Sequence, residues 1–161
     1  MSTVVMEGAK TSWRNIVAER WSSIHNANRI KKELRRLGVS SYDLWRSGGA
    51  YLSRLLEPDE TLHGAVYEYD DNGSKILVAT DWRIVFLDQQ PLFISEDEIP
   101  YDEVSGISYT RFGQQLTVVI HTHEKDYMVR TVAQVGAEAL LAYVEDKTLK
   151  QRNEQLLEEA L

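Results

Sequence analysis

The stretch between Thr61 and Val132 constrains the fold most, because it is a succession of short apolar segments separated by turn signals. Its clearest part runs from Ser74 to Asp88, where two segments rich in Ile, Val and Phe meet at a polar Thr-Asp step. β-Branched and aromatic residues suit a pleated, half-buried surface, and Asn72-Gly73 is a typical hairpin turn. The pattern predicts β-strands joined by tight turns.

Seven strands are predicted, at nearly even spacing, over residues 61–69, 75–79, 82–87, 92–94, 104–111, 116–122 and 127–132. This spacing is typical of an antiparallel sandwich or a partly open barrel. We expect Leu92–Ile94 to start a short edge strand, and Glu96–Glu98 to be a solvated charge run that protects the edge. A helix from Ala133 to about Leu157 follows, so the predicted fold class is α+β.

The N-terminal third is predicted to be helical. Apolar residues recur at helical spacing from Thr11 to Leu37, which is typical of an amphipathic helix. Gly38 is expected to end this helix, and Thr11 or Ser12 to cap its start. Shorter helical segments are expected over 42–46 and 50–56, before Pro58. We therefore divide the chain into an N-terminal helical extension, residues 1–57, and a β-unit with its C-terminal helix, residues 58–161.

Composition excludes several function classes. The chain has no cysteine, so a disulfide framework, a thiol nucleophile and a thiolate metal site are excluded. With no signal peptide and no run long enough to cross a bilayer, we expect a cytoplasmic protein. The net charge of −7 is unevenly distributed: residues 1–57 carry ten Lys or Arg against five Asp or Glu, and residues 58–161 carry eight against twenty. The acidic bulk argues against nucleic-acid binding.

Three segments resemble bacterial pleckstrin-homology domains of the YokE-like type and, more distantly, the GRAM domain. They are Leu56–Glu60, Val78–Leu87 and Ile99–Ile107, and the resemblance covers about residues 56–145. It implies seven antiparallel strands closed by one C-terminal helix, a PH-like barrel or sandwich. It also implies a non-enzymatic module, in a family whose bacterial members frequently look like self-assembling units.

The first hairpin departs from the phosphoinositide-binding members of that family. Those members place several Lys and Arg around this hairpin, whereas residues 68–75 contain three acids and one Lys. A phosphorylated headgroup would be repelled there. We therefore do not expect lipid binding at the first hairpin.

Two groups of polar residues could carry chemistry, and each has a structural alternative. His121 and His123 alternate along a strand end and could reach one metal ion, but a solvated pair is the favoured interpretation. Arg83, beside Asp81, could bind a carboxylate or phosphate with two hydrogen bonds, but a structural ion pair that fixes the turn is favoured. The sequence contains no nucleophile elbow, zinc-protease helix or phosphate-binding glycine loop, so we expect neither an enzyme nor a cofactor.

The favoured function is a protein interaction module that forms a homo-oligomer or binds a protein partner. Trp13, Trp21 and Trp45 are the expected anchors, because buried aromatic residues dominate the energetics of interfaces. The alternative is peripheral binding to anionic membrane lipid through the basic end of the first helix, at Lys31, Lys32, Arg35 and Arg36.

Overall fold

The computed structural model describes residues 4–40 and 48–161, with side chains from residue 13 onward. Trp45 and the helical segment expected at 42–46 lie outside the described residues. In the described part, helix α1 spans Val4–Arg36, helix α3 spans Ala50–Leu55 and helix α4 spans Gln134–Ala160. No helix of these residues is long and apolar enough to cross a membrane.

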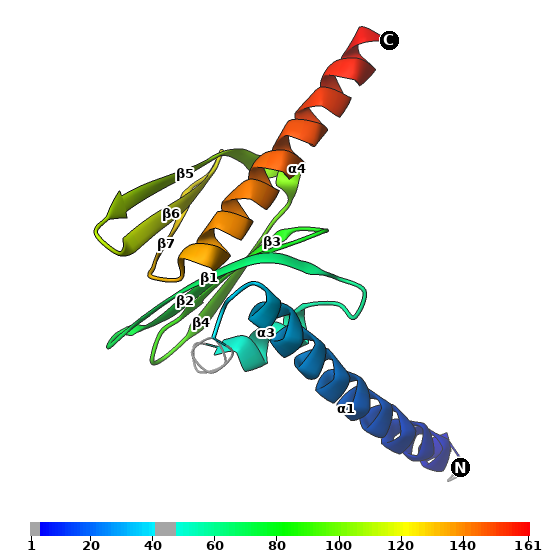
Figure 1. Cartoon of the computed structure of the whole chain (residues 1–161). Helices are drawn as coiled ribbons and strands as arrows, with labels where there is room; N and C mark the ends of the chain where they lie inside the picture. Colours follow the sequence, from blue (N-terminus) through cyan, green and yellow to red (C-terminus); the bar gives the residue numbers. More distant parts are fainter. Residues whose placement is uncertain (1–3, 41–47) are drawn as a thin grey trace.

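Seven antiparallel strands form two sheets. Their bounds are β1 Leu62–Asp70, β2 Gly73–Thr80, β3 Ile84–Gln89, β4 Ile94–Ile99, β5 Val104–Phe112, β6 Gln115–Thr122 and β7 Asp126–Thr131, with a 3₁₀ turn η2 at Tyr101–Glu103. The first sheet has the order β1-β2-β3-β4 and the second β5-β6-β7. Figure 1 shows the two sheets packed as an open sandwich with α4 along one side. The predicted PH-like fold class is confirmed, as a sandwich and not a closed barrel.

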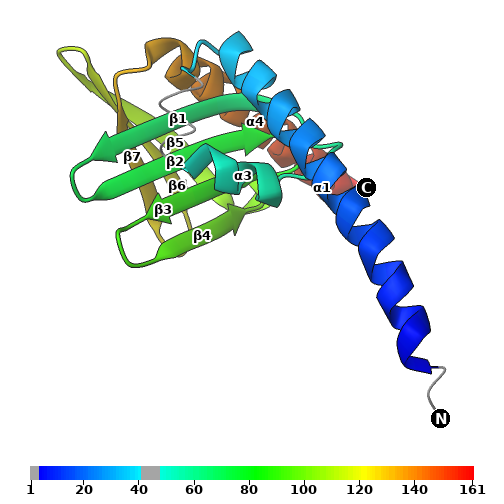
Figure 2. The ribbon, with the colours of Figure 1, turned by 90° about the horizontal axis from the view of Figure 1, so that it is seen from below.

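The central strands of the first sheet, β2 and β3, are largely buried on both faces. Leu77 and Ile84 point into a core shared with the second sheet and α4. Val78 and Val85 point into a second core, formed with α1 and α3. Figure 2 shows these two helices against the outer face of the first sheet. Burial on both faces explains why β2 is a continuous apolar run, because a strand with one wet face alternates between apolar and polar residues.

The C-terminal end of α1 confirms the predicted stop at Gly38. Gly38 has φ +72°, and its N–H donates to the carbonyl of Arg35 at 3.1 Å. The N–H of Val39 donates to the carbonyl of Leu34 at 3.0 Å. This is the Schellman arrangement, in which a glycine in the left-handed region satisfies the last carbonyls. The predicted start was wrong, since the helix begins at Val4 and residues 11 and 12 lie inside it.

Two glycines set the distance between α4 and β1. A Cβ on Gly64 would lie 2.4 Å from the Cα of Leu140, and a Cβ on Gly136 would lie 2.5 Å from the carbonyl oxygen of Ala65. Neither atom belongs to a side chain that could rotate away. The helix can therefore pack this closely on the strand only because both positions lack a side chain.

The edge strand β4 differs from the prediction. It begins at Ile94, the last residue of the predicted start Leu92–Ile94, and continues to Ile99, because Ile94 pairs with Gln89 and Ile99 pairs with Ile84 of β3. The three acids of the charge run are therefore part of the strand, and each has a partner. Glu96 accepts from the Tyr51 hydroxyl at 2.7 Å, Asp97 pairs with Lys125 at 2.7 Å, and Glu98 pairs with Arg83 at 2.8 Å. The charges still lie on the sheet edge, but they are not simply solvated.

Candidate functional site

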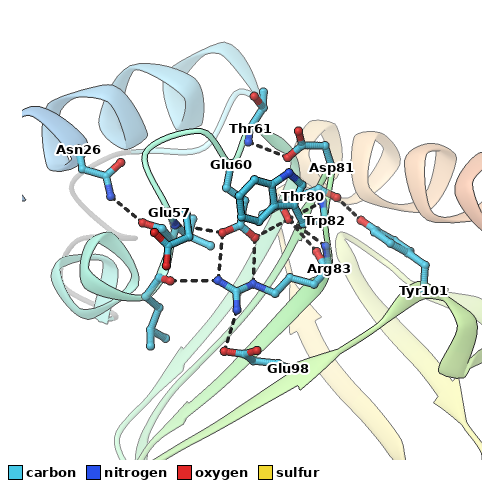
Figure 3. Close-up of polar contacts among 12 residues, drawn as sticks. Asn26, Glu57, Glu60, Thr61, Thr80, Asp81, Trp82, Arg83, Glu98 and Tyr101 are labelled. Carbon is cyan, nitrogen blue, oxygen red and sulfur yellow. Dashed lines mark hydrogen bonds and ion pairs between the residues drawn. The ribbon is translucent and has the colours of Figure 1, made fainter.

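A cluster of polar side chains that includes the buried Glu60 and Thr80 lies at the β2–β3 turn (Figure 3). Glu60, just before β1, has a fully buried side chain. Its Oε1 accepts from the Arg83 Nε at 3.0 Å and from the Thr80 hydroxyl at 2.7 Å, and its Oε2 accepts from the Arg83 Nη2 at 3.0 Å. Such a two-bond pair is the strongest geometry that an arginine and a carboxylate adopt.

All three side-chain nitrogens of Arg83 are engaged with groups of the protein. Its Nε and Nη2 face Glu60, its Nη2 also donates to the carbonyl of Leu55 at 3.0 Å, and its Nη1 lies 2.8 Å from Glu98. Hydrogen bonding to Glu60 raises the pKa of this guanidinium. The structural ion pair predicted for Arg83 is confirmed, with Glu60 and Glu98 as its partners. Asp81 instead accepts from the backbone N–H of Thr61 at 2.8 Å.

The same cluster ties the helical extension to the sandwich. Arg29 of α1 donates to the carbonyl of Glu60 at 2.6 Å and to that of Glu57 at 3.0 Å. Asn26 donates to the carbonyls of Ser53 and Leu56 at 2.9 and 2.7 Å. The C-terminal half of α1 is thus fixed by hydrogen bonds to backbone carbonyls of residues 53–60 as well as by its apolar contacts. The cluster is a structural junction between helices and strands.

The histidine pair does not form a metal centre in this arrangement. Both ring nitrogens of His121 are engaged, Nδ1 with Asp126 at 2.8 Å and Nε2 with Ser108 at 2.9 Å. His123 lines a separate hollow of about 240 Å³ beside η2 and α4. Within the described ranges, no group of three or more His, Cys, Asp or Glu side chains could hold an ion.

The exposed apolar side chains of α1 form the clearest surface feature, and we call this set the tryptophan stripe. Trp13 is 72% exposed and Trp21 is 60% exposed, while the other three members are about half exposed. At 3.6 residues per turn the stripe spans an arc of about 140°. It lies on the part of α1 that projects beyond the sandwich (Figures 1 and 2). The stripe consists of Trp13, Ile16, Val17, Trp21 and Ile24.

The predicted basic residues lie near the opposite end of α1. Lys32, Arg35 and Arg36 are exposed, and Lys31 is half-buried and engaged in an interaction. Arg35 and Arg36 belong to the last turn of the helix, where the helix dipole favours cations. The basic residues and the tryptophan stripe are therefore separate surfaces of one helix.

Comparison with known proteins gives a family for most of this sandwich. A search of curated proteins found no match. A similar solved structure is a DUF1696 family protein with a pleckstrin-homology domain from Shewanella loihica PV-4. That structure is 12% identical with a TM-score of 0.37, and the alignment covers 62% of this chain and 88% of that chain. The model of a family described as "Bacterial PH domain" matches residues 56–146, more than half of the chain. The chain therefore belongs to the bacterial PH domain family.

Proposed function

We propose that this chain is a non-enzymatic interaction module of the cytoplasm that self-associates through the tryptophan stripe of α1. PH-like domains are in general non-catalytic modules that bind proteins or lipids, and family membership supports that coarser role. In this proposal residues 58–161 form the PH-like unit, and residues 1–57 form an extension that presents the contact surface.

The observation that carries the proposal is the exposure of five apolar side chains on one face of a helix. Single exposed apolar residues are ordinary, but a contiguous patch on a projecting element is typical of an interaction surface. Tryptophan is the residue most enriched among interface hot spots. Fully burying a large apolar side chain contributes about 1.5–3 kcal/mol, so burial of the stripe could offset the entropic cost of association.

A second copy of the chain is the partner that the charge distribution favours. In the projecting half of α1, residues 4–24 carry three Lys or Arg against two Asp or Glu, whereas residues 58–161 carry a net charge of −12. Opposite charges on two separate surfaces draw copies together and steer their encounter. In the structure, α1 already uses its C-terminal half against its own sandwich, and its projecting half remains for another molecule (Figure 1).

The test is the mass of the full chain in solution, measured by light scattering from micromolar to submillimolar concentration. We expect a multimer for the natural sequence, and a single-chain mass for the double variant Trp13→Ala, Trp21→Ala. The matched control is Trp82→Ala, which removes an indole of similar exposure from the β2–β3 turn. Circular dichroism of each variant confirms that the helices are kept.

Two outcomes would contradict the proposal. One is a single-chain mass for the natural sequence over the whole concentration range. The other is an unchanged multimer after both tryptophans have been replaced. A single-chain natural protein that binds a different protein through the same tryptophans would point to a heterologous partner, and self-association would be rejected.

A further inference from the structure

The sandwich carries a groove between α4 and the second sheet, which we call the α4–β5 groove. It has a volume of about 270 Å³. Small-molecule pockets usually measure roughly 300–1,000 Å³, so this groove has the size for an inserted side chain more than for a ligand. Its lining residues are Tyr109, Arg111, Leu116, Glu138, Leu141, Ala142 and Glu145.

The groove combines an apolar floor with one acidic wall. Leu116, Leu141 and Ala142 supply the apolar surface, while Glu138 and Glu145 stand two turns apart on α4. Within the described part of the chain, neither carboxylate has an ion-pair partner. The groove is therefore suited to an apolar side chain that is accompanied by a cation.

The tryptophan stripe has the complementary chemistry. Arg20 lies within the arc of the stripe, 20° from Trp13 around the helix at 100° per residue, and it lines a hollow with Val17, Trp21 and Ile24. Glu19, the nearest acid in the sequence, lies 100° away from Arg20 around the helix and outside the arc of the stripe. No ion pair within the described residues engages Arg20. An apolar ridge that contains one unpaired arginine matches an apolar groove with unpaired glutamates on one wall.

We propose that the tryptophan stripe of one copy docks over the α4–β5 groove of a second copy, with one of its apolar side chains inserted and with Arg20 beside Glu138 and Glu145. The inference rests on the proposed self-association and names the surface that receives α1. In this orientation Trp21 lies on the side of α1 away from Arg20, and it faces Arg111 on the β5 wall of the groove in the second copy. A guanidinium over an indole face is a favourable contact, so Arg111 does not oppose this orientation.

The chain cannot fill its own groove. Helix α1 is packed on the outer face of the first sheet, and its stripe lies on the half that points away from the molecule (Figures 1 and 2). The groove lies on the other side of the sandwich, where α4 meets β5. Each copy therefore offers one ridge and one groove, and such a heterologous contact closes a ring or continues as a filament.

A charge-exchange experiment tests the contact. The single variant Arg20→Glu should weaken self-association about tenfold or more. The double variant Glu138→Lys, Glu145→Lys should weaken it by a similar factor, because each variant brings like charges together. The triple variant with all three changes should return to within a fewfold of the natural association constant. Sedimentation equilibrium at low salt measures the constants. The matched control is Glu154→Lys with Glu158→Lys, the same charge change on the exposed end of α4.

The outcomes separate this inference from the proposed function. If the groove variants associate like the natural chain while the double tryptophan variant does not, the groove assignment is wrong and the role of the stripe stands. If Arg20→Glu and the double Glu138→Lys, Glu145→Lys variant both associate weakly, and the triple variant also associates weakly, direct pairing of these charges is rejected. Ala142→Trp provides a charge-free check, since an indole placed in the groove of a folded chain must also weaken association.

Discussion

Arg83 donates two hydrogen bonds, each 3.0 Å long, to the carboxylate of Glu60, and that carboxylate is fully buried. The two residues are 23 positions apart, so the pair joins the entry of β1 to the β2–β3 turn. A buried ion pair is not in itself a large source of stability, because both charges lose their hydration. Losing one partner is costly, because the other charge is left buried and unpaired.

The first prediction concerns the difference in stability between losing one partner of this ion pair and losing both. Arg83→Met should lower the free energy of unfolding by about 3–5 kcal/mol, measured by urea denaturation. Adding Glu60→Leu should recover part of this loss, because no buried carboxylate then remains. The control is Lys150→Met, which removes an exposed ion pair with Asp146 and should cost less than about 1 kcal/mol. A loss below about 1 kcal/mol for Arg83→Met would show that the pair is dispensable.

The second prediction concerns the close contact of α4 and β1. Gly64→Ala should lower the free energy of unfolding by about 1–3 kcal/mol or more, because the new methyl group would overlap the backbone of Leu140. The control is Gly106→Ala in β5, where the nearest atom to a new Cβ is 3.9 Å away, on His121. Urea denaturation of both variants checks this difference. Equal stability of the two variants would mean that α4 can shift freely on the sheet.

The third prediction concerns alkaline pH. Burial raises the pKa of Tyr101 well above the ordinary value of about 10, and its hydroxyl donates to the carbonyl of Thr80. Because the folded-state pKa is the higher one, this contribution to stability is complete below pH 10 and is lost as the pH rises above it. The free energy of unfolding should fall above pH 10, and Tyr101→Phe should make that fall shallower. An identical slope in both proteins would contradict this assignment.

The fourth prediction concerns anionic membranes. Lys32, Arg35 and Arg36 are exposed, and each basic residue near an anionic surface contributes about 1 kcal/mol. About 3 kcal/mol corresponds to weaker than millimolar binding, and the net charge of −7 opposes it. We expect no co-sedimentation of micromolar protein with phosphatidylserine vesicles at physiological salt. Salt-sensitive binding that is lost when all three residues become Gln would establish the membrane function instead.

Local signals in the sequence located most elements of the fold. Asn72-Gly73 marked the β1–β2 turn, and Gly38 marked the end of α1, because both positions use backbone conformations that few residues adopt. The start of α1 at Val4 was missed because the apolar spacing from which the helix was predicted begins only near Trp13. The bounds of β4 were missed because they depend on pairing with β3, and the acidic residues of that strand have low β-propensity.

The sites were less predictable, because they depend on contacts between distant segments. Arg83 was correctly expected to form an ion pair, but nothing near it in the sequence identified Glu60, which lies before β1. The α4–β5 groove joins residues of β5, β6 and α4 that share no local pattern. The tryptophan stripe was visible from its helical spacing, but a spacing does not say which half of a helix its own sandwich covers.

The exposure of the described tryptophans has a spectroscopic consequence. Trp13, Trp21 and Trp82 are all more than half accessible to solvent, and none belongs to either core. Unfolding therefore changes the surroundings of these three indoles little, whereas docking of α1 would remove two of them from water. A blue shift of intrinsic emission on concentrating the folded chain would then report assembly directly, without any attached dye.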